Sequence, residues 1–176
     1  MTFVTPLREV GKVWLSLVRR AAHLVPPLAN FVVRPLVELS VIHFARWTVV
    51  EQLPSAGSAP LAHPYLLFES HFDTDTSAYV DNFIEITPNR MRLVWATSFG
   101  YPGVIPSADF TTWTEANELN DGYYWCAYPR GSVSIIRTAI ELEARFDVFR
   151  RRAEAMTAEE FARAWPQFLT EVQPWL

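Results

Sequence analysis

Four segments between residues 41 and 129 decide the fold that this sequence predicts: VIHFARWTVV (41–50), YLLFESHF (65–72), MRLVWATS (91–98) and YYWCAY (123–128). Each segment is rich in the β-branched and aromatic residues that strands favour. With helical segments between them, they follow the order β-α-β-β-α-β, which predicts one antiparallel sheet with helices on one face. The other face of that sheet is then free to form a pocket or a dimer interface.

The connection between the first two of these segments is not helical. Residues 54–64 are rich in Pro, Ala, Gly and Ser, which predicts a loop. Either the first two strands form a hairpin with this long loop, and the helix expected over residues 74–85 is the first crossover, or the loop is an insertion. We expect an α+β fold with a four-stranded antiparallel, ferredoxin-like sheet, and leave its strand order open.

Residues 1–40 predict an amphipathic helical extension, with a helical pattern from residue 6. Apolar residues recur at helical spacing, four basic residues lie largely outside that stripe, and Pro26-Pro27 ends the first helix. A second helix is expected over residues 28–39, kinked or broken at Pro35. The apolar stripe comprises Leu7, Val10, Trp14, Leu17, Val18 and Ala21, and the basic residues are Arg8, Lys12, Arg19 and Arg20.

Two interpretations of this basic amphipathic helix remain open. It docks on the core or on a larger protein partner, or it lies on an anionic membrane surface through residues 6–40. Trp14 and the apolar run FVV (31–33) favour membrane contact without deciding between the two.

The C-terminal part predicts two further helices. Residues 132–155 carry an apolar stripe at helical spacing. A final helix is expected over residues 157–172, opened by a capping box of Thr157 and Glu160. We accordingly expect three parts: the helical extension (1–40), an α+β sheet domain (41–155) and a C-terminal helix packed on that domain (156–176).

Composition limits the class of protein. The chain has 176 residues, half of them apolar, and a net charge of −4, which is typical of a globular protein without a nucleic-acid footprint. The single cysteine, Cys126, excludes an internal disulfide and a multi-cysteine metal site, and its aromatic surroundings predict that it is buried. No signal-peptide pattern and no apolar stretch of about 20 residues occurs, so we expect a cytoplasmic location, peripheral to the membrane if the first helix binds lipid.

His43, Glu69 and His71 are the candidate catalytic residues. Side chains alternate along a strand, so Glu69 and His71 share a face, where the carboxylate can raise the basicity of the imidazole. His43 supplies a second acid or base if its strand is adjacent. In the structural alternative, the histidines are core or interface residues and Glu69 forms an ion pair with Arg46 or Arg92.

Other polar and aromatic groups complete the expected site. Histidines and carboxylates suit zinc, manganese or iron, but no known metal-ligand spacing occurs, and no metal or other cofactor is assigned. Asp73 and Asp75 are expected to cap the following helix, and the turn FGYPG (99–103) is placed to rim a pocket. The expected ligand-binding side chains are Arg46, Trp47, Trp95, Tyr101 and Trp125.

The segments IHFARW (42–47), LFESHFD (67–73) and YYWCAYP (123–129) resemble a bacterial family of the dimeric α+β barrel superfamily, over roughly residues 40–150. That family is associated with haem-peroxidase and lipid-oxygenation proteins, and the resemblance implies ferredoxin-like sheets that pair through their open faces. The chlorite dismutases and dye-decolourising peroxidases of the superfamily take a proximal histidine from a late helix. Residues 132–155 contain no histidine, so a haem would need His43 or His71.

Two functions are compatible with these observations. The first is a dimeric α+β barrel domain that binds a small apolar ligand or acts as an oxidoreductase. The second is a non-catalytic accessory subunit that docks on a larger enzyme or membrane complex through its N-terminal helices. The expected partners are a second copy of the chain or a larger protein, with no nucleic acid.

Overall fold

The chain forms two compact units, Met1–Cys126 and Ala127–Leu176. The computed structural model describes residues 1–53, 59–119, 123 and 125–175, apart from the side chains at positions 28, 29 and 32. The division after Cys126 differs from the divisions that the sequence predicts after residues 40 and 155. The difference has two causes: the N-terminal segment contributes a strand to the sheet, and the last two helices pack on each other.

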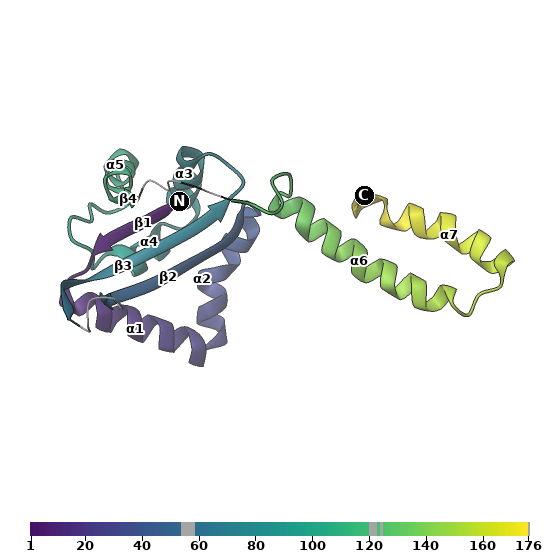
Figure 1. The fold of residues 1–176 in the computed structure, drawn as a ribbon, viewed down its shortest axis with the longest axis horizontal. Helices are drawn as coiled ribbons and strands as arrows, with labels where there is room; N and C mark the ends of the chain where they lie inside the picture. Colours follow the sequence, from purple (N-terminus) through teal and green to yellow (C-terminus); the bar gives the residue numbers. More distant parts are fainter. Residues whose placement is uncertain (54–58, 120–122, 124, 176) are drawn as a thin grey trace. The chain divides into compact units, whose positions relative to one another are not determined.

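The first unit is built on a four-stranded antiparallel sheet in the order β2-β3-β1-β4 (Figure 1). β2 and β3 form a hairpin, which is one of the two arrangements left open above, and β1 pairs with β3 and β4. The predicted α+β class and four-stranded antiparallel sheet are confirmed. The strands are β1 (Thr2–Pro6), β2 (Ile42–Gln52), β3 (Pro60–Phe72) and β4 (Glu118–Leu119).

Strand β1 lies within the region expected to be a helical extension. Its residues alternate in burial, with Phe3 and Thr5 buried, and it has a strand neighbour on each side. Residues 2–6 are therefore an interior part of the sheet rather than an appendage to it. The helical pattern begins only after Pro6, the last residue of the strand.

Two of the four predicted strands are wrong. The predicted strand 91–98 coincides largely with helix α4 (Pro88–Trp95), in which Met91 and Trp95 are buried on one side at helical spacing. A proline in the first turn favours this helix. The described residues of 123–128 form no strand. Cys126 is exposed there, so the prediction that it is buried is also wrong.

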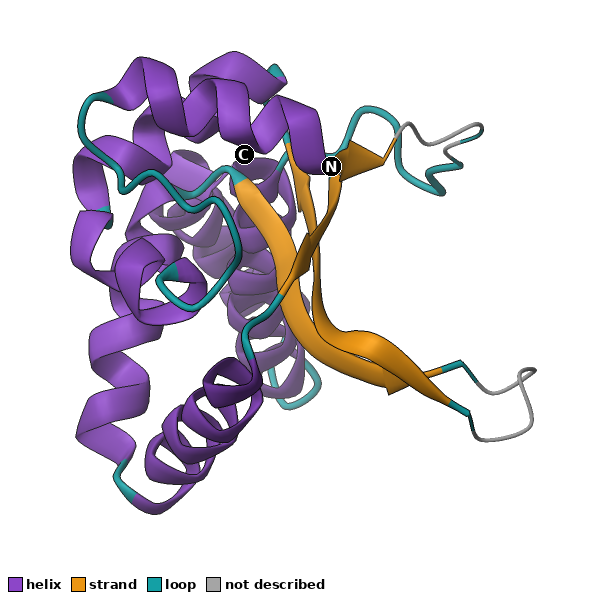
Figure 2. Cartoon of the chain, turned by 90° about the vertical axis from the view of Figure 1, so that its left-hand side faces the viewer, coloured by secondary structure: helices purple, strands orange, loops and turns teal. Residues whose placement is uncertain are grey.

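Five helices lie on one side of this sheet (Figure 2). α1 (Glu9–Leu24) and α2 (Pro26–Leu39) connect β1 to β2 and confirm the two predicted N-terminal helices, with Pro35 inside α2. Asp75 caps the first turn of the next helix by accepting a hydrogen bond from the Ala78 amide at 2.9 Å, as predicted. The helices between β3 and β4 are α3 (Thr76–Ile86), α4 and α5 (Ser107–Asn117).

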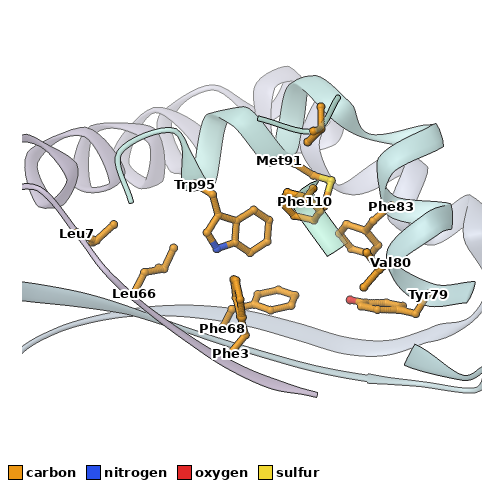
Figure 3. Packing of buried hydrophobic residues seen from close by; sticks show 11 residues of the cluster. Phe3, Leu7, Leu66, Phe68, Tyr79, Val80, Phe83, Met91, Trp95 and Phe110 are labelled. Atoms are coloured by element: carbon orange, nitrogen blue, oxygen red, sulfur yellow. The ribbon is translucent and has the colours of Figure 1, made fainter. Parts of the chain in front are cut away.

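The core of the first unit lies between the sheet and these helices (Figure 3). Trp95 stands edge-on to Phe3 of β1 and Phe68 of β3, with ring centroids 5.9 and 5.2 Å away. Some buried polar groups on this side are hydrogen-bonded: the Tyr79 hydroxyl donates to Ser70 Oγ at 2.6 Å. In the described part of the chain, Trp95 Nε1, Thr97 Oγ1 and the Tyr101 hydroxyl are buried without a hydrogen-bond partner. The buried contacts that stabilise the first unit thus lie on the side of the sheet that packs on the helices.

The second unit is a helical hairpin of α6 (Val133–Ala153) and α7 (Ala158–Val172), followed by a short 3-10 turn, Gln173–Trp175. Both helices were predicted, and the capping box of Thr157 and Glu160 is confirmed. Hydrogen bonds from the Thr157 backbone and side chain hold the pKa of the Glu160 carboxyl below its usual value. Phe149, Phe168 and Val172 form the buried centre of this hairpin.

Candidate functional site

Two surfaces of the first unit carry the candidate functional residues. One is the side of the sheet that faces away from the helices, called here the open face. Its residues alternate with the buried ones, and none of them is fully buried. The open face comprises Thr2, Val4, Pro6, Phe44, Arg46, Thr48, Val50, Tyr65, Leu67, Glu69 and His71.

Glu69 and His71 both lie on the open face, in successive residue pairs of that face in the β2–β3 hairpin. Glu69 lies opposite Arg46, and the two side chains form an ion pair. This is the structural alternative expected for Glu69. His71 lies opposite Phe44 and stacks on its ring, with centroids 4.3 Å apart. Glu69 and His71 therefore share a face, as strand alternation requires.

His43 is held by a carboxylate that was expected to cap a helix. Its Nε2 lies 2.6 Å from Asp73 Oδ1, and both side chains are partly buried. The pairing register shifts between Ile42 and Phe44, which is a β-bulge, and a bulge re-aims the side chain within it. The result is a carboxylate-oriented imidazole at the end of β2, with Asp73 as the partner. Strand alternation gives no signal for this pair, because a bulge breaks the alternation.

The expected ligand-binding residues do not lie together. Arg46 is on the open face, whereas Trp47 and Trp95 line a cavity of about 20 Å³ on the helix side of the sheet. Trp125 is 71 % exposed. Tyr101 packs edge-on against Phe110, and burial raises the pKa of its hydroxyl. A space of 20 Å³ holds at most a single water molecule rather than an apolar ligand.

Three further features of the chain bear on a possible site. Among the described residues, no group of three or more His, Cys, Asp and Glu side chains could hold a metal ion. A groove of about 400 Å³ lies on the α6–α7 hairpin, and its lining includes the apolar Val148 and Phe168 and the charged Arg145 and Glu171. No helix in the described part of the chain is both long and apolar enough to cross a bilayer.

The second surface is the outer side of α1 and α2. α1 packs inward through Gly11, which is buried against Thr97, and through Leu15. Within the apolar stripe, Val10 (61 %), Trp14 and Leu17 are exposed. Leu7, which precedes the helix, is fully buried in the core. At the corner between the helices, Leu24 is 81 % exposed. The exposed apolar residues of the two helices are Val10, Val13, Trp14, Leu17, Leu24, Val25, Phe31, Val33 and Val37.

Polar groups on this surface leave several cations facing solvent. Arg34 pairs with Glu38 one turn away, and Lys12 lies near Glu9 and Glu51, which raises the pKa of its ammonium group. Within the described part of the chain, Arg19 and Arg20 enter no ion pair. The sequence predicted this apolar stripe, but not the exposure of Val10, Trp14 and Leu17.

No family model, curated protein or solved structure matches this chain.

Proposed function

We propose that this chain is a non-catalytic accessory module that docks on a larger assembly through the outer side of α1 and α2. The observation that carries the proposal is the exposure of apolar side chains along α1, which are Val10, Val13, Trp14, Leu17 and Leu24. Exposed apolar patches of this extent on a folded protein mark interaction sites. Each large apolar side chain gains about 1.5–3 kcal/mol when it is fully buried, so covering several of them provides a strong driving force.

The inner contacts of α1 support a role in docking rather than in folding. The helix is held on the unit at Gly11, where an added Cβ would lie 2.7 Å from Thr97 Oγ1, and by Leu15 against the core. The Trp14 indole donates a hydrogen bond to the Leu93 carbonyl at 2.8 Å, which fixes the helix further. The outer stripe is thus displayed on a helix that is already anchored, and docking does not require it to leave the sheet.

For the fold, we infer a ferredoxin-like arrangement. The elements follow the order strand, helices, strand, strand, helices, strand, and β1 lies between β3 and β4. In a split β-α-β unit, the strand that follows the hairpin turn inserts beside the first strand, which is the position of β3 next to β1. The order supports this inference although two of the four strands differ from the predicted segments.

The docking proposal is tested with Leu17→Asp, which places a charge in the stripe. Extracts of cells that normally make the protein are fractionated by size, and the full-length chain is followed. We expect the wild-type chain in a large or particulate fraction and the variant as a free chain. Ile140→Asp on α6 is the matched control, because Ile140 is 60 % exposed and outside α1 and α2. A wild-type chain that fractionates alone would overturn the proposal.

Deletion of residues 1–40 is not a suitable test. It removes β1, which pairs with β3 over five residue pairs and carries the core residue Phe3. Loss of association after such a deletion would report unfolding of the sheet.

A second candidate function is small-ligand binding or oxidoreductase activity on the open face. The contact that favours it is the 2.6 Å pairing of His43 with Asp73, beside the stack of Phe44 on His71. A second copy whose open face met this one would enclose these groups, as in dimeric α+β barrels. Native mass spectrometry with an absorption spectrum tests this function. We expect a dimer that carries a bound small molecule. The His71→Ala variant should remain folded but lose the bound molecule. A ligand-free chain overturns it.

A further inference from the structure

We infer that the docking partner of α1 and α2 is an anionic lipid surface, into which the corner between the two helices inserts. The inference rests on the proposed function, because it names the partner of the same surface. Three features of that surface carry it: the composition of the corner, the continuity of the apolar stripe and the local charge.

The corner is apolar and projects from the unit. Leu24 ends α1, Val25 separates the helices, and Pro26 and Pro27 open α2; all four are exposed. Figures 1 and 2 both show this corner away from the strands. Because proline carries no backbone N–H, the first turn of α2 has fewer unsatisfied donors to bring into lipid than another sequence would have.

The apolar surface extends from the corner along both helices. On α1 it follows Leu17, Trp14 and Val13 at spacings of three and four residues, and on α2 it includes Phe31. An amphipathic helix with Trp and Leu on one face and basic residues elsewhere lies in the plane of a membrane interface. Trp14 adds apolar area to this surface, while its indole N–H stays hydrogen-bonded to the Leu93 carbonyl.

The charge distribution selects an anionic surface. Residues 1–40 contain five basic and two acidic residues, a net charge of +3, whereas the whole chain has a net charge of −4. Arg90 adds a cation beside the stripe: its guanidinium lies 4.2 Å from the Phe31 ring centroid, and its Nε donates to the Phe31 carbonyl at 2.7 Å. Net positive charge and exposed apolar side chains therefore occur together in residues 1–40.

A protein groove fits this surface less well than lipid. Helices that bind in grooves are usually gripped along one face by a concave partner. Here the apolar area is spread over two helices that meet at a convex corner, and α1 is fixed from behind by the close approach of Gly11 to Thr97. A fluid apolar layer beneath anionic headgroups accommodates a convex corner without a matching shape.

The test is co-sedimentation of the full-length protein with vesicles. One set contains phosphatidylcholine alone, and the other an equimolar mixture of phosphatidylcholine and phosphatidylserine. We expect binding to the mixed vesicles that weakens as salt concentration rises, since salt screens exposed charges. Replacing phosphatidylserine by phosphatidylglycerol separates general charge recognition, which the inference predicts, from recognition of one headgroup.

Variants assign the binding to the corner. Leu24→Asp should reduce vesicle affinity at least about tenfold, and Leu24→Ala by less, because the alanine removes apolar area without adding charge. Arg20→Gln should reduce it about fivefold. Ile140→Asp on α6 should leave it unchanged. Circular dichroism checks that each variant is folded, and the graded series of Leu24 replacements keeps the test valid if the aspartate variant unfolds.

The outcomes separate this inference from the proposal on which it rests. No binding to mixed vesicles, or equal loss in Leu24→Asp and Ile140→Asp, overturns the lipid inference. If Leu17→Asp still releases the chain from a large assembly in extracts, the docking proposal stands and the partner is a protein. If neither effect is seen, both are overturned.

Discussion

Neighbouring residues of β3 face two different environments. Leu66, Phe68 and Ser70 are buried under the helices, whereas Leu67, Glu69 and His71, which alternate with them, remain partly exposed. The buried residues join the aromatic core, and the exposed ones form the open face with its ion pair and its ring stack. The contrast shows that position along the strand decides whether a residue contributes mainly to stability or is available for binding.

The largest expected difference between the two sides of β3 is in the free energy of unfolding lost on substitution. Phe68 is 1 % exposed and packs against Trp95, so Phe68→Ala should lower the free energy of unfolding by about 3–5 kcal/mol. Leu67→Ala, on the neighbouring position, should cost about 1 kcal/mol, because only part of its side chain leaves water on folding. Urea denaturation of both variants provides the comparison. Equal losses would show that the open face is covered in solution.

The covered side can also be tested at the helix that packs on it. A Cβ at position 11 would lie 2.7 Å from Thr97 Oγ1, so Gly11→Ala forces the two groups apart. We expect a loss of about 1–3 kcal/mol, as in other overpacked sites. Thr97→Ala should restore part of it in the double variant, which urea denaturation can measure. Val10→Ala, on the outer side of α1, should change stability by less than about 0.5 kcal/mol.

The buried side of the first unit should also make its stability depend on pH, through two tyrosines. Burial raises the pKa of Tyr79 and of Tyr101, so the folded protein keeps both hydroxyls neutral where the unfolded chain ionises them, near pH 10. Their contribution is present below pH 10 and lost above it, since unfolding then releases protons. Stability should fall by up to about 1.4 kcal/mol per pH unit for each tyrosine. Urea unfolding between pH 8 and 11 measures the slope, and Tyr79→Phe should reduce it.

Local signals predicted the elements that they can specify alone. The capping box at Thr157 and Glu160, the cap at Asp75 and the apolar periodicity of residues 132–155 each act within one turn or one helix. The β2–β3 hairpin was one of two arrangements that the sequence left open, and its two strands are long and close in sequence. Such elements could be predicted because their stabilising contacts are short-range.

The errors have a common physical cause in long-range contacts. β1 has five residues and β4 two, and β1 is defined as a strand by its pairing with residues 65–69 of β3. The segment 91–98 is apolar enough for either a strand or a helix, and burial of Trp95 against two strands favours the helix. Within the site, alternation placed Glu69 and His71 on one face, but the bulge that turns His43 to Asp73 leaves no periodic signal.

A small effect is also expected on the open face, at the ion pair of Arg46 and Glu69. The guanidinium is largely exposed, and solvent screens the attraction, so the pair should contribute less than about 1 kcal/mol. Arg46→Ala, Glu69→Gln and the double variant form a cycle that isolates the coupling in urea denaturation. A coupling of several kcal/mol would mean that the open face is shielded from water. In that case the open face would not differ from the helix-covered face in its exposure to water. A dimer in which a second copy packs on the open face would then explain the result better.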